Sequence, residues 1–167
     1  MLAALEALRL RLPVGAQEVR TGLAVVDLPG RFQVLPGQPT VILDVAHNPH
    51  AAATLAQNLD NMHFAPYTYA VFGAMQDKDI DGVIAHLKGR VDHWCLTDLP
   101  LPRAASATEI KDRLVHAYGE MPPARDTERS ILTFASPAEA FANALSRAGE
   151  NLSLIHISEP TRQAEIS

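Results

Sequence analysis

TVILDVAHNPHAAA, from Thr40 to Ala53, is the stretch of sequence that decides the fold. It begins with β-branched and apolar residues, the apolar run ends on Asp44, and a His-Asn-Pro turn leads into an alanine-rich segment. This order predicts a buried parallel strand over 40–45 that is followed by a helix. Open α/β sheets bind their ligands at the carboxyl ends of the strands. We therefore expect Asp44, His47 and Asn48 to lie where a ligand binds.

The rest of the chain alternates between short apolar runs and helical patterns. Strands are predicted over 32–35, 67–73, 91–97 and 131–134, and helices over 49–61, 80–87, 108–118 and 136–148. This alternation predicts an α/β fold, with a Rossmann-like, mostly parallel sheet and helices on both of its faces. Two further helices, over 1–12 and 16–26, precede a turn at Pro29 and Gly30.

Composition and charge limit the class of protein. At 167 residues the chain can hold one domain with a sizeable core, and its formal net charge of -5 argues against a nucleic-acid binder, which normally has a basic face. The single cysteine, Cys95, has no partner for an internal disulfide, which favours a reducing compartment. No apolar run approaches the ~20 residues of a membrane span, and the first residues lack the pattern of a signal peptide. The sequence thus predicts a cytoplasmic protein that binds no membrane.

Three motifs follow one another along the chain: PGRFQ at 29–33, DVAHNP at 44–49 and, after Gly73, DKD at 77–79. Each motif alone is common, but their order and spacing together resemble the C-terminal domain of the folylpolyglutamate synthase / dihydrofolate synthase family. That family belongs to the ATP-dependent Mur-type amide ligases. The resemblance covers roughly 2–151.

The resemblance also implies a division of the chain. Residues 1–28 are expected to be the end of a central ATPase domain, a helical remnant, and 29–151 a Mur ligase C-terminal domain. The remaining stretch, LSLIHISEPTRQAEIS at 152–167, is similar to a translated sequencing-library adapter and is expected to be a non-native tail. In that case the sheet lacks its final strand and one of its edges stays open. The alternative is a genuine strand over 152–157 that is followed by a tail.

Arg31 and Asp44 are the candidate cofactor-binding residues. A guanidinium on a rigid Pro-Gly turn can bind phosphate oxygens in a bidentate manner and offset the charge that develops during phosphoryl transfer. A carboxylate at the end of a strand can accept hydrogen bonds from a ribose. The structural alternatives are a surface arginine paired with an acid, and a carboxylate that caps the following turn. The resemblance favours ATP for both residues, because the family's matching arginine contacts ATP across a cleft between domains.

Four further side chains are candidates for the substrate side of the site. The resemblance implies that His47 and Asn48 line the active cleft, where they orient the substrate carboxylate or the incoming amine. His47 and Lys78 are the candidate catalytic residues, since a lysine in that loop can neutralise phosphate or acyl-phosphate charge. Arg103 is a candidate contact of the glutamate substrate. The structural alternatives are a turn histidine with a satisfied ring, and a solvated helix start with Asp79 as its N-cap.

Phosphate-binding loops are missing from the sequence. Neither GxxxxGK[ST] nor GxGxxG occurs, so the predicted sheet is no evidence for NAD. In the resembled family the phosphate-binding loop and the magnesium ligands lie in the N-terminal and central domains. ATP and Mg²⁺ are therefore the expected cofactors, with the metal held outside this chain. His47 and His50 have a spacing that suits a metal, but a four-coordinate site needs further ligands, and no metal site is predicted here.

The resemblance implies one reaction for the full enzyme. An ATP-dependent ligase adds L-glutamate to dihydropteroate or to a reduced folate through an acyl phosphate, and this domain closes over ATP and the glutamate site. The expected partners are ATP, L-glutamate and a pterin or folate, the full-length enzyme is expected to be a monomer, and the isolated chain is expected to be inactive. Two alternatives stay open. One is a peptidoglycan-precursor amino-acid ligase, and the other is a non-catalytic nucleotide-binding or interaction module.

Overall fold

Strands and helices alternate along the chain, as the sequence predicts. The computed structural model describes residues 2–8, 10–11, 13–25, 28–62, 67–119, 130–147 and 152–157. Within these ranges the helices are α1 (Leu2–Ala7), α2 (Ala16–Val25), α3 (Pro49–Asp60), α4 (Ile80–Leu87), α5 (Ala107–Tyr118) and α6 (Pro137–Arg147). The strands are β1 (Gln33–Leu35), β2 (Thr40–Asp44), β3 (Tyr67–Phe72), β4 (His93–Thr97), β5 (Ser130–Phe134) and β6 (Leu152–Ile157).

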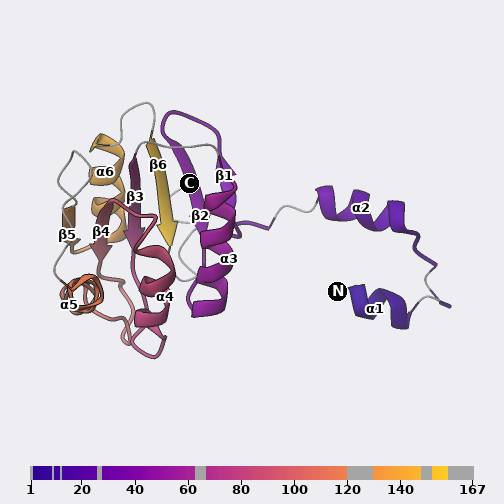
Figure 1. The fold of residues 1–167 in the computed structure, drawn as a ribbon, viewed down its shortest axis with the longest axis horizontal. Coiled ribbons are helices and arrows are strands. Elements are labelled where there is room, and N and C mark those ends of the chain that lie inside the picture. The colour runs from indigo at the N-terminus through magenta and orange to yellow at the C-terminus, as the bar shows by residue number, and fades with distance from the viewer. Residues whose placement is uncertain are drawn as a thin grey trace.

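The strands form one sheet in the order β1-β2-β6-β3-β4-β5 (Figure 1). β1 is antiparallel to β2, whereas every other neighbouring pair in the sheet is parallel. A helix follows each of the strands β2, β3, β4 and β5, so the connections cross over the faces of the sheet. The prediction of a Rossmann-like, mostly parallel sheet is confirmed.

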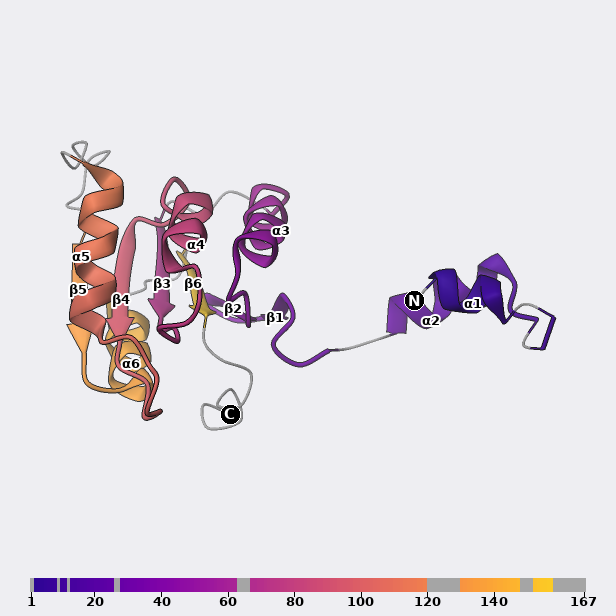
Figure 2. The same ribbon diagram turned by 90° about the horizontal axis from the view of Figure 1, so that it is seen from below.

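Helices cover the two faces of the sheet unequally. α3, α4 and α5 lie on one face, and α6 lies on the other (Figure 2). Successive side chains of β3 alternate between the two layers: Ala70 and Phe72 belong to the larger core cluster beneath α3, α4 and α5, whereas Tyr69 and Val71 belong to the smaller cluster beneath α6. Because both faces of this strand are buried, its sequence is a continuous apolar run rather than an alternating one.

β6 lies inside the sheet and corrects one prediction. Its residues pair in parallel with β2 on one side and with β3 on the other, so that Ile155 lies opposite both Ile42 and Ala70. The expectation that this stretch supplies no strand and leaves an edge of the sheet open is therefore wrong. The physical reason is that β2 and β3 both offer unpaired backbone donors and acceptors to any extended segment between them. The non-native origin of 152–167 stays a prediction.

α1 and α2 lie to one side of the sheet, apart from the other helices (Figures 1 and 2). The predicted helix over 1–12 is wrong in its extent, because α1 ends at Ala7. A helix of this length is marginal in water unless its apolar face packs against another surface, and Leu8 and Leu10 beyond it are exposed. Val25 at the end of α2 is exposed as well. Among the described residues, no helix is long and apolar enough to span a bilayer.

Candidate functional site

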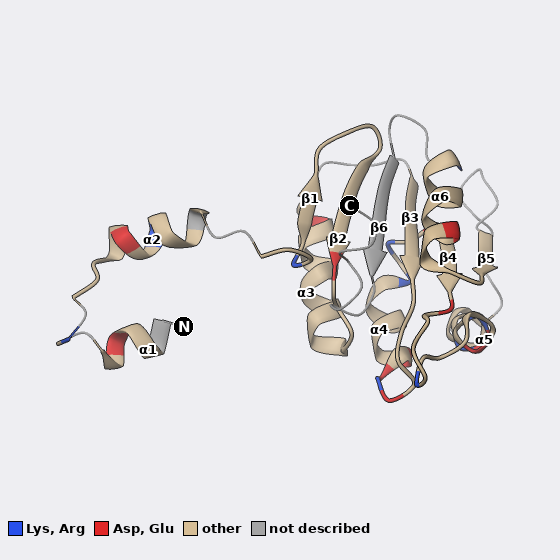
Figure 3. Cartoon of the chain, turned by 180° about the vertical axis from the view of Figure 1, so that it is seen from behind, with Lys and Arg blue, Asp and Glu red and all other residues tan. Residues whose placement is uncertain are grey.

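Four loops meet at one edge of the sheet, where β2, β3 and β4 end. They are the turn at 29–32 before β1, the segment 45–48 after β2, the loop 73–79 after β3 and the loop 98–106 after β4. Figure 3 shows charged positions at this edge: a basic one before β1, an acidic one at the end of β2, and both kinds in the loop that leads into α4. The residues predicted for the site all lie on these loops or at the end of β2.

Asp44 ties the turn at 29–32 to the end of β2. Its Oδ2 accepts a hydrogen bond from the amide of Phe32 at 2.8 Å, and its Oδ1 accepts one from the amide of Ala46 at 2.7 Å. Burial raises the pKa of this carboxyl, whereas the amide donors and the positive charge of Arg31 partly offset that increase in pKa. Arg31 and Asp44 thus lie close together at the edge. The carboxylate already binds two backbone donors, and its remaining lone pairs are what a ribose could use.

The ring of His47 is held in one tautomer. Its Nδ1 lies 2.8 Å from the carbonyl oxygen of Val45. Because a carbonyl can only accept, Nδ1 carries the proton and donates it, which leaves Nε2 of the neutral ring as an acceptor. The side chain is half-buried. The structure therefore supplies a fixed imidazole with one acceptor atom at the edge of the sheet.

Asn48 is the N-cap of α3. Its Oδ1 accepts a hydrogen bond from the amide of Ala51 at 2.9 Å, and its backbone is extended, as an N-cap requires. Pro49 follows in the first turn of the helix, where the missing N–H leaves no donor unsatisfied. The oxygen of the Asn48 amide is therefore used by the helix, and the NH₂ group of this exposed side chain is the donor that a ligand could use.

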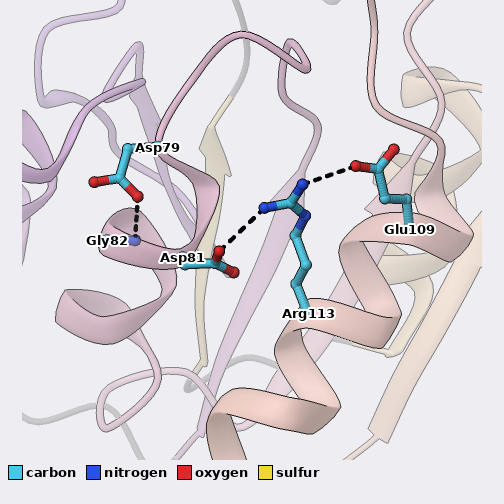
Figure 4. A network of polar contacts seen from close by, with 5 residues as sticks. All are labelled: Asp79, Asp81, Gly82, Glu109 and Arg113. Atoms are coloured by element: carbon cyan, nitrogen blue, oxygen red, sulfur yellow. Dashed lines mark hydrogen bonds and ion pairs between the residues drawn. The ribbon is translucent and has the colours of Figure 1, made fainter.

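The loop after β3 contains Asp77, Lys78 and Asp79 in three different roles. Asp79 is the N-cap of α4 and accepts a hydrogen bond from the amide of Gly82 at 2.9 Å (Figure 4). Lys78 Nζ lies 3.3 Å from Asp77 Oδ2, and this hydrogen bond is the main cause of the lowered pKa of Asp77. The alternative of a helix start with Asp79 as its N-cap therefore holds. Lys78 has only a weak ion pair with the partly exposed Asp77, so its charge stays available to a ligand.

Arg113 of α5 connects the start of α4 to the start of its own helix. Its guanidinium binds Asp81 at 3.1 Å and Glu109 at 3.0 Å (Figure 4). Both acids are partly exposed, so the energy of these pairs is small. This arginine lies close to the edge of the sheet, but its charge is already matched by two carboxylates.

Arg103 lies beside the Asp77–Asp79 loop because the two loops are joined through their backbones. The amide of Gln76 donates to the carbonyl of Arg103 at 2.9 Å, and the amide of Ala105 donates to the carbonyl of Ala74 at 2.9 Å. The exposed Arg103 side chain contributes to the lowered pKa of Asp77. The structure therefore brings Arg103 and Lys78 together around one acid, which the sequence did not predict.

The starts of α3 and α4 are in direct contact. A Cβ added to Gly82 would lie 2.5 Å from Cγ of Pro49, so the absence of a side chain at this position lets the two helices approach. This contact holds the loop that carries His47 and Asn48 against the loop that carries Lys78.

Two residues at this edge were missed by the sequence analysis. Gln33 accepts a hydrogen bond from the amide of Gly30 at 3.1 Å through its Oε1. Asp98, after β4, accepts one from the amide of Ala107 at 2.7 Å and so stabilises the start of α5. Asp98 follows a buried strand just as Asp44 ends one, and that signal could have found it. Gln33 is the last residue of the PGRFQ motif, but the motif assigned it no role of its own.

The edge combines basic side chains that can bind an anion with the carboxylates of Asp44, Asp77, Asp79 and Asp98. Arg31, Lys78 and Arg103 supply positive charge from three separate loops, and His47 supplies a neutral acceptor. In the part of the chain that the structure describes, no three His, Cys, Asp or Glu side chains gather as metal ligands would. The arrangement can bind phosphate or carboxylate oxygens.

Comparison with known proteins identifies relatives of this chain. The family model described as Mur ligase, glutamate ligase domain, matches residues 30–157. A dihydrofolate synthase/folylpolyglutamate synthase of Escherichia coli (strain K12) is 44% identical over 112 residues, which are 66% of this chain and 26% of that protein. The chain thus spans about a quarter of the length of this curated relative.

Solved structures agree in fold and in coverage. E. coli FolC in complex with DHPP and ADP has a TM-score of 0.82 and 34% identity, over 99% of this chain and 36% of that chain. A bifunctional folylpolyglutamate synthase/dihydrofolate synthase with Mn, AMPPNP and L-glutamate bound has a TM-score of 0.75 and 35% identity, over 93% of this chain and 35% of that chain. The whole chain, α1 and α2 included, therefore has a counterpart within a longer protein.

Proposed function

The chain belongs to the Mur ligase family, glutamate ligase domain, and from this premise we propose that it is the C-terminal part of an ATP-dependent dihydrofolate synthase / folylpolyglutamate synthase. The observation that carries the proposal is the edge of the sheet. Arg31, His47, Lys78 and Arg103 lie on loops at this one edge, and support comes from the 44% identity over 112 residues to a protein of that name. The reaction joins L-glutamate to dihydropteroate or to a reduced folate.

The proposed reaction has two steps. A carboxylate oxygen of the pterin or folate attacks the γ-phosphorus of ATP, the bond to the β-phosphate oxygen breaks, and ADP leaves from an acyl phosphate. The amine of glutamate then attacks the acyl carbon, the carbon–oxygen bond to phosphate breaks, and the amine loses a proton as the amide forms. Negative charge develops on phosphate oxygens in both steps, and fixed cations stabilise such charge.

Arg31 and Asp44 bind the nucleotide in this proposal. The guanidinium of Arg31 extends from a backbone that is tied to the end of β2, so the origin of the side chain is fixed near the phosphate oxygens that it contacts in this proposal. Asp44 contributes the lone pairs that the amides of Phe32 and Ala46 leave unused. Support comes from the relatives solved with ADP or AMPPNP.

His47, Asn48, Lys78 and Arg103 serve the glutamate side. Nε2 of His47 accepts a hydrogen bond from the glutamate amine, because Nδ1 is held by Val45. Lys78 neutralises the acyl phosphate, and Arg103 binds a carboxylate of glutamate. The NH₂ group of Asn48 donates to the substrate, since its oxygen caps α3. A relative with L-glutamate bound supports this assignment.

The rest of the site lies outside this chain. Residues 1–28 are the end of the central ATPase domain, which the exposed side chains of Leu10, Val25 and Leu28 support as a surface for packing. Mg²⁺ offsets phosphate charge in this chemistry, and its ligands lie in the upstream domains. This domain then acts as a lid that excludes water when it closes over the nucleotide.

Rapid-quench measurement of ADP formation in the longer protein tests the assignment. We expect Arg31→Ala to slow phosphorylation about 100-fold, the usual size for loss of one preorganised donor, while Arg103→Ala leaves this step nearly unchanged and raises the KM for glutamate. Arg20→Ala, an exposed change on α2, is the matched control. Equal slowing by Arg31→Ala and Arg103→Ala would contradict the assignment. Steady turnover by the isolated chain would contradict the proposed division of the site.

A further inference from the structure

The turn that carries Arg31 has an unusual backbone. Gly30 has a φ of 69° and Phe32 a φ of 48°. Glycine adopts such an angle freely, but a residue with a Cβ does so only where its surroundings impose it. The side chain of Phe32 packs against the main core cluster. The turn is therefore held in its shape by specific contacts rather than by the preference of its own residues.

Three successive backbone amides of this turn each donate a hydrogen bond to a defined acceptor. Gly30 donates to Oε1 of Gln33 at 3.1 Å, Arg31 to the carbonyl of Leu28 at 3.0 Å, and Phe32 to Oδ2 of Asp44 at 2.8 Å. Two of the three acceptors are side chains, so sequence changes can remove them without touching the turn itself. Gln33 and Asp44 thus clamp the turn from its two ends.

The side chain of Arg31 depends on this backbone for its position. It is exposed, and its positive charge interacts with the carboxyl of Asp44. The direction of its Cα–Cβ bond, which is the start of a long flexible side chain, is set by the turn. Loss of either clamp would let the guanidinium sample a wider volume.

We propose that Gln33 is a positioning residue for nucleotide binding, which acts by fixing the turn that aims Arg31. This inference rests on the proposed function of Arg31 as a phosphate contact. It assigns to Gln33 no contact with the nucleotide. Its oxygen binds the amide of Gly30, and the effect reaches the phosphates through the direction of the Arg31 side chain.

The test combines an exchange measurement with kinetics of the longer protein. Gln33→Met keeps the length of the side chain and removes the acceptor, Gln33→Glu keeps an acceptor oxygen, and Gln57→Met, on the exposed face of α3, is the matched control. We expect the amide of Gly30 to exchange faster in Gln33→Met, and to regain protection in Gln33→Glu. We expect the KM for ATP to rise between about two-fold and ten-fold in Gln33→Met, as for the loss of one neutral hydrogen bond, with kcat at saturating ATP nearly unchanged.

A double-mutant cycle separates the two proposals. In the Arg31→Ala background, Gln33→Met should have no further effect on ATP binding, because the guanidinium that it positions is gone. If Arg31→Ala weakens ATP binding while Gln33→Met alone does not, the positioning role is wrong and the proposed function stands. An equal effect of Gln33→Met in both backgrounds also overturns the positioning role. If Arg31→Ala leaves ATP binding and phosphorylation unchanged, the proposed function fails and the positioning role fails with it.

Discussion

Replacement of Gly82 by alanine should destabilise the chain by about 2 kcal/mol. The added Cβ would lie 2.5 Å from Cγ of Pro49 and 2.6 Å from Oδ2 of Asp79, which is closer than such atoms approach. Overpacking of this kind costs about 1–3 kcal/mol, and displacement of the Asp79 carboxylate from its N-cap position adds up to about 1 kcal/mol. The better helix propensity of alanine offsets about 1 kcal/mol of this loss.

Urea unfolding measures the difference, and Gly89 provides the control. A Cβ at Gly89 meets nothing within 4 Å, so Gly89→Ala should leave stability unchanged or raise it by about 0.4–1 kcal/mol through the entropy of the unfolded chain. The same chemical change should therefore lower the urea midpoint at Gly82 and leave it unchanged or raise it at Gly89, with the m-value constant. A Gly82→Ala chain as stable as the wild type would refute the proposed contact between α3 and α4.

Three further predictions concern single side chains. Asn48→Ala should lower the free energy of unfolding by about 1 kcal/mol through loss of the α3 cap, whereas Asn48→Asp should retain the cap and the stability. An equal loss of stability in the two variants, measured by urea unfolding, would contradict the role of Asn48 as a cap. Burial lowers the pKa of His93 in the folded state, so the unfolded chain binds more protons below about pH 6.5 and stability falls as the pH falls. His93→Gln should flatten that dependence between pH 7.5 and 5.5, and an unchanged slope would contradict it. Burial raises the pKa of the Cys95 thiol to about 11, so iodoacetamide at pH 8 should label the unfolded chain far faster than the folded one, and equal rates would contradict this.

The elements of the sheet were predictable because each depends on a local pattern. The apolar run that ends at Asp44 predicted β2, and the helical pattern over 108–118 predicted α5. The positions of Asp44, His47 and Asn48 followed from one rule, that ligands bind where parallel strands end. Arg31 and Arg103 were proposed for the site from the resemblance. The exact ends of short helices did not follow, since α1 lacks the packing that would decide them.

Contacts between distant residues were beyond local patterns. The hydrogen bond between Asp44 and the amide of Phe32 depends on the antiparallel register of β1 and β2, which places Gln33 opposite Leu43. The pairing of β6 with β2 and β3 depends on an opening in the middle of the sheet. The sequence left a strand over 152–157 open as an alternative, but nothing in it indicated a place between β2 and β3. Lys78 and Arg103 lie near each other because a β-bridge between Met75 and Ala104 joins their two loops.

The place of β6 has a consequence for how the protein is made. Thr40 lies opposite Ser153 in the sheet, so the pairing of β2 is complete only after the much later segment 152–157 has been synthesised. Until then the nascent chain holds β2 and β3 with an unfilled gap between them, and each has an edge that another polypeptide can bind. Folding that ends with such a distant pairing is slow. We expect the newly synthesised chain to depend on chaperones more than a helical bundle of the same length would.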